Sequence, residues 1–347
     1  MAGSGTAQLR DGGALLRVEN LVVEFPAAGG RRVHAVSDVS FDVLEGETLG
    51  LVGESGCGKS TTARAVMQLP RPTSGRVRFE DRELTTLSGD ELRRTRMRLQ
   101  MIFQDPISSL NPRRRVCDIV AEPLAIWGLG TPTERRTRVA EVLDAVGLDA
   151  DSVGERRPHE FSGGQCQRIS IARALMLEPK LVICDEPVSA LDVSVQAQIL
   201  NLLEDMKARY GLTLIFIAHD LAVVRNVSDR VAVMYLGKLC EVAPADELYH
   251  APAHPYTATL LASVPVPDPG VRPDPAADEI NAELPSPLAP PSGCRFRTRC
   301  PRAKAVCAER EPEMREVAAG HYAACHFMLD RPVLAGHTVF EERKSNA

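Results

Sequence analysis

The sequence predicts an α/β fold whose core is a parallel β-sheet. Two continuous apolar runs of strand length, Leu181–Cys184 and Leu214–Ile217, are typical of parallel strands covered on both faces. A helix over Val195–Tyr210 is expected between them, as a βαβ crossover requires. A third apolar run, Thr48–Val52, leads through a glycine-rich turn into a helix expected over Thr61–Met67.

The remaining elements surround this core. Strands are expected over Leu15–Val23 and Ser37–Val43, with turn residues at Pro26–Gly30 between them, and they indicate an antiparallel β-layer. Helical periodicity follows in the middle of the chain, so a helical subdomain is expected there. The further predicted elements are short strands at Arg76–Phe79 and Met101–Phe103, a helix over Glu134–Val146, and a helix with Ile169, Ala172, Leu175 and Met176 on one face.

Length and composition bound the class of protein. The 347 residues, 44% hydrophobic and 25% charged, are typical of a soluble globular protein with two unequal domains. A net charge of -5 gives no overall basic footprint for nucleic acid, so no nucleic-acid partner is expected. No apolar stretch approaches the roughly 20 residues that cross a bilayer. Residues 1–13 are interpreted as a disordered tail rather than a signal peptide, which predicts a cytoplasmic protein whose nine cysteines form no disulfides.

The glycine-rich turn fits the phosphate-binding pattern G-x-x-x-x-G-K-[ST] at every fixed position. Glycines allow backbone N–H groups to turn toward a phosphate, and the following helix N-terminus adds partial positive charge. Lys59 is expected to bind the β- and γ-phosphates, and Ser60 to bind Mg²⁺. The predicted nucleotide-binding residues of this loop are Gly53, Glu54, Ser55, Gly56, Cys57, Gly58, Lys59, Ser60 and Thr61.

Two further motifs complete a nucleotide site. The apolar run at 181–184 ends in Asp185, suited to hold Mg²⁺, and Glu186, suited to polarise an attacking water. Phe161–Gln165 opens a helix with a serine and two glycines, which predicts a second anion-binding nest without a lysine. Its members are Ser162, Gly163, Gly164 and Gln165. A single nucleotide cannot use both nests of one chain.

Over residues 16–250 the sequence resembles the ATP-binding subunits of ABC transporters, with Phe161 in place of the usual leucine of the signature motif. The resemblance implies an ABC nucleotide-binding domain of the P-loop NTPase class. It also implies that the signature motif of one protomer closes over ATP bound to the other. By position, it assigns Gln104 to the Q-loop, with contact to Mg²⁺ or the lytic water, and Asp192 to the dimer seam. His219 corresponds to the switch histidine that contacts the γ-phosphate, and Phe25 to the aromatic residue that stacks on adenine, although a core position is the alternative for Phe25.

The C-terminal residues resemble the extension of dipeptide, oligopeptide and nickel importer ATPases, through His254-Pro255-Tyr256-Thr257. A C-terminal domain is expected over residues 251–335, with nine prolines in 265–291 as a linker. Arg295, Arg297, Arg299 and Arg302 are expected on an exposed basic face. Four cysteines lack the C-x₂₋₄-C pairs typical of zinc. The resemblance implies a [4Fe-4S] cluster on them, with zinc or unliganded thiols as alternatives: Cys294, Cys300, Cys307 and Cys325.

The resemblance implies an ATPase that energises import of di- and oligopeptides. Its expected partners are a homologous second ATPase in a heterodimer, two permease subunits and an extracytoplasmic binding protein, and its expected location is the cytoplasmic face of the membrane. A nickel or glutathione importer ATPase is one alternative. The other is a soluble ABC-type ATPase acting on nucleic acid or ribosomes, for which a coiled-coil insertion or two fused cassettes would be expected.

Overall fold

The computed structural model describes residues 5–263 and 284–329, which form two compact units. The first unit combines the chain up to residue 42, residues 49–85 and the chain from residue 219 onward. The second combines residues 43–48 with residues 86–218. No helix within the described ranges is both long enough and apolar enough to span a membrane.

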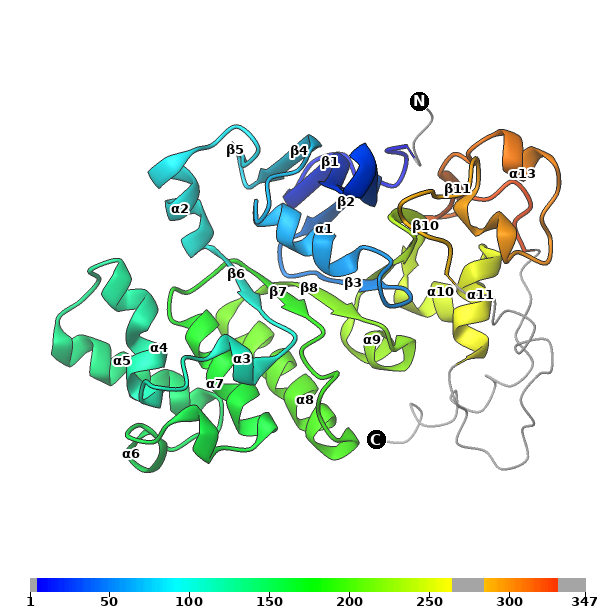
Figure 1. Cartoon of the computed structure of the whole chain (residues 1–347). Helices are drawn as coiled ribbons and strands as arrows, with labels where there is room; N and C mark the ends of the chain where they lie inside the picture. The colour runs from blue at the N-terminus through cyan, green and yellow to red at the C-terminus, as the bar shows by residue number, and fades with distance from the viewer. Residues whose placement is uncertain (1–4, 264–283, 330–347) are drawn as a thin grey trace, which may run out of the picture. The chain divides into compact units, whose positions relative to one another are not determined.

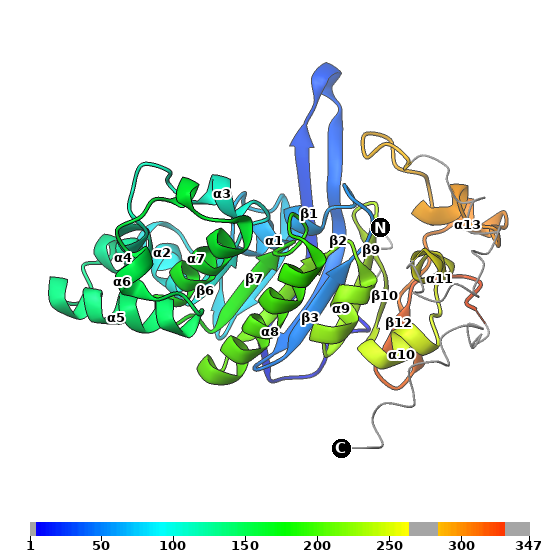
Figure 2. The same cartoon turned by 90° about the horizontal axis from the view of Figure 1, so that it is seen from below.

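The first unit contains the predicted antiparallel layer. Its four strands lie in the order β2-β1-β4-β5, and β1 pairs antiparallel with β4 so that Leu16 faces Phe79. Both side chains are fully buried. Figure 2 shows β1 and β2 as a long pair of neighbouring strands. The strands are β1 (Ala14–Pro26), β2 (Arg32–Leu44), β4 (Ser74–Phe79) and β5 (Arg82–Glu83), with the 3₁₀ turn η1 (Ala28–Gly30) between β1 and β2.

Residues just before β1 differ from the predicted disordered tail. Gln8 is only 2% exposed, and its Nε2 donates to the Ser40 carbonyl oxygen at 2.7 Å. Arg10 pairs with the buried carboxylate of Asp42 at 2.6 Å. The tail prediction is therefore wrong for this segment, because polar side chains that look solvated in the sequence have buried partners on β2.

A second sheet of the first unit carries the glycine-rich turn. β3 (Thr48–Val52) pairs parallel with β9 (Arg230–Tyr235), which pairs antiparallel with β10 (Lys238–Pro244). The C-terminal segment continues this sheet, because β12 (His321–Ala323) pairs with β10 and β11 (Arg315–Ala318) pairs with β12. The helices of this unit are α1 (Lys59–Val66), α9 (Leu221–Val227), α10 (Ala245–His250), α11 (Pro255–Ala262), η3 (Arg295–Thr298) and α13 (Val306–Glu309).

The second unit contains the predicted βαβ crossover. β6 (Leu99–Ile102), β7 (Leu181–Asp185) and β8 (Thr213–Ala218) pair in parallel, and α8 (Val193–Tyr210) connects β7 to β8. Every residue of β7 and β8 is buried, as their continuous apolar sequence predicts. In Figure 1 these strands lie side by side in the second unit.

The other helices of the second unit form the predicted helical subdomain. α7 packs against α3, α4 and α5. The predicted apolar face of α5 is confirmed, since Val139, Val142 and Leu143 are buried. α4 was not predicted from the sequence, and it contains Pro123. These helices are α2 (Gly89–Met97), α3 (Pro106–Ser109), α4 (Val116–Ile126), α5 (Pro132–Ala145), α6 (Ala150–Val153), η2 (Pro158–Glu160) and α7 (Gly163–Leu175).

A buried carboxylate on β10 joins three segments of the first unit. Glu241 is fully buried and accepts the backbone N–H groups of Ala253 at 2.6 Å and His254 at 2.9 Å. The Nε2 atom of His321, on β12, lies 2.6 Å from the same carboxylate. Burying a carboxylate is costly unless it is hydrogen-bonded, and all three contacts offset that cost. Most of the predicted proline-rich linker lies outside the described residues, but the Pro287 carbonyl oxygen accepts the His34 N–H.

His254 predicts a measurable pH dependence of stability. Burial lowers the pKa of His254 to about 4 from its usual 6.5, and its Nδ1 accepts the Tyr256 N–H. Between these values the unfolded chain binds a proton that the folded chain does not, so the free energy of unfolding falls as the pH falls from 6.5 toward 4. The slope contributed is at most about 1.4 kcal/mol per pH unit.

Thermal unfolding of the wild type and His254→Asn at pH 7.5, 6.0 and 5.0 measures this contribution. Asparagine keeps a capping oxygen but does not titrate. The variant should lose stability less steeply below pH 6.5, whereas parallel slopes for the two proteins would contradict the assignment.

Candidate functional site

The phosphate-binding loop between β3 and α1 is shaped by glycines. Gly53, Gly56 and Gly58 all have positive φ angles, which side chains rarely adopt. A Cβ atom on Gly53 would lie 2.1 Å from the Met234 carbonyl oxygen, and one on Gly58 would lie 2.3 Å from the Ala35 carbonyl oxygen. Only glycine permits this close backbone packing, so the predicted glycine-rich turn is present in the structure.

Lys59 lies inside the loop rather than in solvent. Its side-chain ammonium donates to the carbonyl oxygens of Gly53 at 2.8 Å and Glu54 at 3.1 Å, and the residue is only 4% exposed. Ser60 and Thr61 follow in the first turn of α1 and are partly exposed. Burial raises the pKa of the Cys57 thiol to about 11, so the thiol is neutral at physiological pH. The loop therefore presents one positive charge and no competing thiolate.

In the second unit, Gln104 and Glu186 come together from two separate motifs. The Gln104 Nε2 atom donates to the Glu186 carboxylate at 2.9 Å. Glu186 has a φ of 48°, and its N–H donates to the Ile217 carbonyl oxygen at 3.0 Å. Asp185, the preceding residue, is fully buried at the end of β7. The structure thus places a carboxylate in a strained backbone conformation and orients it with an amide.

The second nest lies at the N-terminus of α7, as predicted. Ser162 and Gln165 form a capping box: the Ser162 hydroxyl accepts the Gln165 N–H at 3.3 Å, and the Gln165 side chain accepts the Ser162 N–H at 3.0 Å. A Cβ atom on Gly164 would lie 2.6 Å from a methyl group of Val195 on α8. The glycine therefore permits α7 and α8 to pack closely behind the nest.

The remaining predicted site residues lie at exposed ends of elements. Asp192 precedes α8, and His219 follows β8; both are exposed. Phe25, near the end of β1, is 36% exposed and is therefore not a core residue. All three side chains are therefore exposed to solvent.

Comparison with known proteins agrees with these motifs. Residues 36–189 match the ABC transporter family, and residues 240–307 match the family described as "Oligopeptide/dipeptide transporter, C-terminal region". The chain is 52% identical to the putative oligopeptide transport ATP-binding protein YkfD of Bacillus subtilis over 313 residues, 90% of this chain and 95% of that protein. It is 51% identical to the oligopeptide transport ATP-binding protein OppF of Escherichia coli over 320 residues, with the same coverage.

A solved structure matches as well. The ATP-binding cassette MJ0796, in a dimeric post-hydrolysis state bound to ADP and Pi, is 29% identical with a TM-score of 0.61. The match covers 66% of this chain and 98% of that cassette. The chain belongs to the ATP-binding proteins of ABC transporters. This ABC ATPase has the predicted P-loop fold, couples ATP hydrolysis to transport and works with membrane permease subunits.

ABC ATPases bind ATP with Mg²⁺, and the donor chemistry of this chain fits that ion. The Ser60 hydroxyl, the Asp185 carboxylate and the Gln104 side-chain carbonyl are hard oxygen donors, which Mg²⁺ prefers. Mg²⁺ keeps several waters and binds substrate phosphates, so it needs few protein ligands.

The predicted iron–sulfur cluster is wrong. Within residues 5–263 and 284–329, no group of three or more His, Cys, Asp or Glu side chains is arranged to hold a metal ion. The four C-terminal cysteines line a cavity of about 10 Å³, roughly the space of one water. Burial raises the pKa of Cys294 to about 11 and that of Cys325 to about 12, so both thiols are protonated at neutral pH. The same finding gives no support to the zinc alternative on this set.

The other five cysteines were predicted to be buried small residues. Cys57, Cys166, Cys184 and Cys240 are buried. Cys117 is partly exposed, and for that residue the prediction is wrong.

Two residues at this site were missed in the sequence. Arg299 was expected on an exposed basic face, but its side chain is 9% exposed and its Nη1 lies 2.9 Å from both carboxylate oxygens of Glu54. The Tyr256 hydroxyl accepts the Glu54 N–H at 3.0 Å. Arg295 was also misassigned, because it donates to the Leu236 carbonyl oxygen and to the Ser37 hydroxyl. No local signal reveals these contacts, since Arg299 lies 245 positions from Glu54.

Proposed function

We propose that this ABC ATPase energises the import of di- and oligopeptides through a membrane permease complex. The observation that carries the proposal is the match of residues 240–307 to the oligopeptide/dipeptide transporter C-terminal region, on a chain that also contains the complete ATP motifs. The two relatives named above are both oligopeptide transport ATP-binding proteins. We assign residues 16–250 to the ATP-binding domain and residues 251–335 to the transporter-specific C-terminal domain.

The site residues have distinct proposed roles. Lys59 binds the β- and γ-phosphates, and Glu186 polarises the attacking water as a general base. Gln104 orients that carboxylate, a role supported by the 2.9 Å hydrogen bond between the two side chains. Asp185 and Ser60 hold Mg²⁺, which neutralises charge on the phosphates. His219 contacts the γ-phosphate and Phe25 stacks on adenine.

The second nest acts in a dimer. Ser162, Gly163, Gly164 and Gln165 of one protomer close over ATP bound to the loop of the other, with Asp192 at the seam. The N-terminus of α7 supplies the N–H groups and partial positive charge that favour an anion. The dimeric state of the solved cassette supports this assignment. The partner in our proposal is a homologous second ATPase, so the working unit is a heterodimer.

A permease contact is proposed beside Gln104. Ile107 is 57% exposed and Phe103 is 39% exposed, and these apolar side chains flank Gln104 in the chain. Exposed neighbouring apolar groups favour a protein partner. Two permease subunits and an extracytoplasmic binding protein complete the proposed complex, with this chain peripheral on the cytoplasmic face of the membrane.

Lys59→Ala should weaken ATP binding by about tenfold to a hundredfold, because a charge-assisted contact to the phosphates is lost. Titration with a fluorescent ATP analogue measures the change. Lys180→Ala, which removes a surface pair with Glu45, is the matched control and should bind normally. Equal affinity of Lys59→Ala and wild type would remove Lys59 from its role.

Glu186→Gln should retain ATP binding and slow hydrolysis by about 10² or more, because the water loses its general base. Phosphate release at saturating ATP measures the rate, and the nucleotide titration confirms retained binding. Near-normal turnover of this variant would assign the base to another group.

Purification of the native complex should recover two permease subunits, a second ATPase and an extracytoplasmic binding protein holding a peptide. Ile107→Asp should reduce co-purification of the permease while leaving basal ATP hydrolysis unchanged, because a charge is placed in an apolar contact. Captured nickel or glutathione would replace the peptide assignment. Co-purification with ribosomes, together with stimulation of hydrolysis by RNA, would overturn import altogether.

A further inference from the structure

Three groups of Glu54, the second residue of the phosphate-binding loop, are hydrogen-bonded within the first unit. Its carbonyl oxygen accepts from Lys59 at 3.1 Å. Its N–H donates to the Tyr256 hydroxyl at 3.0 Å, and its carboxylate pairs with Arg299 through both oxygens at 2.9 Å. Two of these three hydrogen-bonding interactions, those with Tyr256 and Arg299, therefore involve residues more than 200 positions downstream in the chain.

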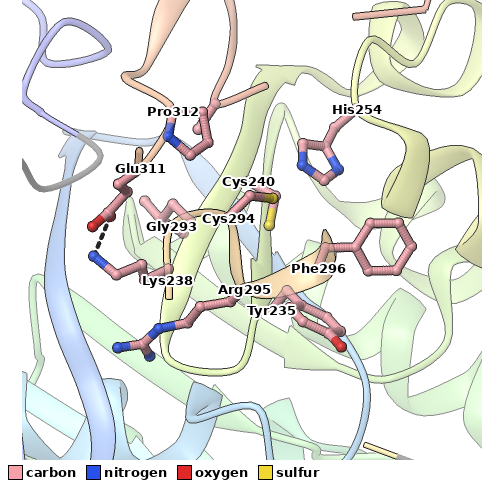
Figure 3. A pocket seen from close by; sticks show the side chains of 12 residues that line it. Tyr235, Lys238, Cys240, His254, Gly293, Cys294, Arg295, Phe296, Glu311 and Pro312 are labelled. Carbon is pink, nitrogen blue, oxygen red and sulfur yellow. Dashed lines mark hydrogen bonds and ion pairs between the residues drawn. The ribbon is translucent and has the colours of Figure 1, made fainter. Parts of the chain in front are cut away.

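Arg299 is held in place by a packed aromatic cluster, which consists of Phe296, Tyr235 and Tyr256. Phe296, on η3, is 1% exposed, and its ring centroid lies 5.2 Å from that of Tyr235 and 5.3 Å from that of Tyr256. Figure 3 shows Phe296, Tyr235 and Arg295 among the side chains that line one small cavity. The Arg299 guanidinium in turn lies 5.8 Å from the centroid of the Tyr235 ring.

The C-terminal segment is also linked to the loop indirectly, through the turn between β9 and β10. Arg295 donates to the Leu236 carbonyl oxygen in the β9–β10 turn, and the next residue, Gly237, donates its N–H to the Cys57 carbonyl oxygen at 2.7 Å. A Cβ atom on Gly237 would lie 2.9 Å from the Arg295 guanidinium. The C-terminal segment therefore contacts the loop directly through Arg299 and also contacts, through Arg295, the turn that is hydrogen-bonded to the loop.

The Glu54 carboxylate raises an electrostatic problem. A phosphate-binding loop attracts anions through its N–H groups and Lys59, yet this loop also contains a negative side chain that is 28% exposed. An unpaired carboxylate there would repel the phosphates of ATP. Arg299 neutralises it with a side chain that is itself 9% exposed, so solvent screens the pair only weakly.

We propose that Arg299 is a positioning residue for nucleotide binding, which acts by neutralising Glu54 and anchoring its side chain, with Tyr256 fixing the loop backbone. The C-terminal segment thereby sets the affinity of the ATP site. This inference rests on the proposed role of the loop in ATP binding and deepens it.

The test compares charge variants of the full-length chain by titration with a fluorescent ATP analogue. Arg299→Met should raise the Kd about tenfold, because one charge interaction is lost. The maximal hydrolysis rate at saturating ATP should stay within about twofold of wild type, since the base and water are untouched. Arg299→Lys, which keeps the charge, should give an intermediate Kd.

Glu54→Gln separates charge neutralisation from packing. In the double variant Glu54→Gln/Arg299→Met both charges are removed, and the Kd should return close to that of wild type. A purely structural role for Arg299 predicts instead that the double variant remains as weak as Arg299→Met, which would overturn the proposal. Because the double variant leaves no unpaired carboxylate at position 54, it serves as the test if Arg299→Met alone does not fold.

Two further variants complete the design. Arg302→Met removes an exposed arginine three positions away and should leave the Kd unchanged. Lys59→Ala tests separately whether the loop binds ATP. If Lys59→Ala loses ATP binding and Arg299→Met does not, the proposal for Arg299 fails while the function stands. If neither affects binding, the ATP role of the loop fails with it.

Discussion

The close approach of the phosphate-binding loop to neighbouring backbone is the constraint on which the ATP site depends. A Cβ atom on Gly53 would collide with the Met234 carbonyl oxygen, and one on Gly58 with the Ala35 carbonyl oxygen, so neither position admits a side chain. This packing exists because β3 pairs with β9 and the chain runs from β3 through the loop directly into α1. In this tight turn the carbonyl oxygens of Gly53 and Glu54 accept hydrogen bonds from the Lys59 ammonium. The positive charge is therefore positioned before nucleotide binds.

The C-terminal segment is an integral part of the unit that contains this loop. β11 and β12 continue the sheet of β3, β9 and β10, and Glu241 joins β10 to β12 and to the turn before α11. Buried hydrogen bonds to a carboxylate are strong, and a partner left alone would be costly, so the three segments are expected to fold together. The transporter-specific part of the chain therefore shares its core with the ATP-binding loop.

The C-terminal cysteines and arginines show that spacing along the sequence does not predict the environment of a side chain. Four cysteines within 32 residues indicated a metal cluster, and four arginines among them indicated a solvated face. In the folded chain burial raises the pKa of the Cys294 and Cys325 thiols, and two of the arginines turn inward to bond backbone and Glu54. Spacing along the chain fixes neither solvent access nor the direction of a side chain, and those decide protonation and pairing.

The sequence by itself determined the fold class, the βαβ order and the loop, because apolar periodicity and glycine positions act locally on strands, helices and turns. It also determined which side chains are chemically suited to phosphate and to water activation. Only the tertiary structure decided that Gln104 meets Glu186, that Gln8 is buried, and that Arg299 and Tyr256 hold Glu54. These contacts join residues distant in the chain, and their energies depend on burial and geometry that packing alone creates.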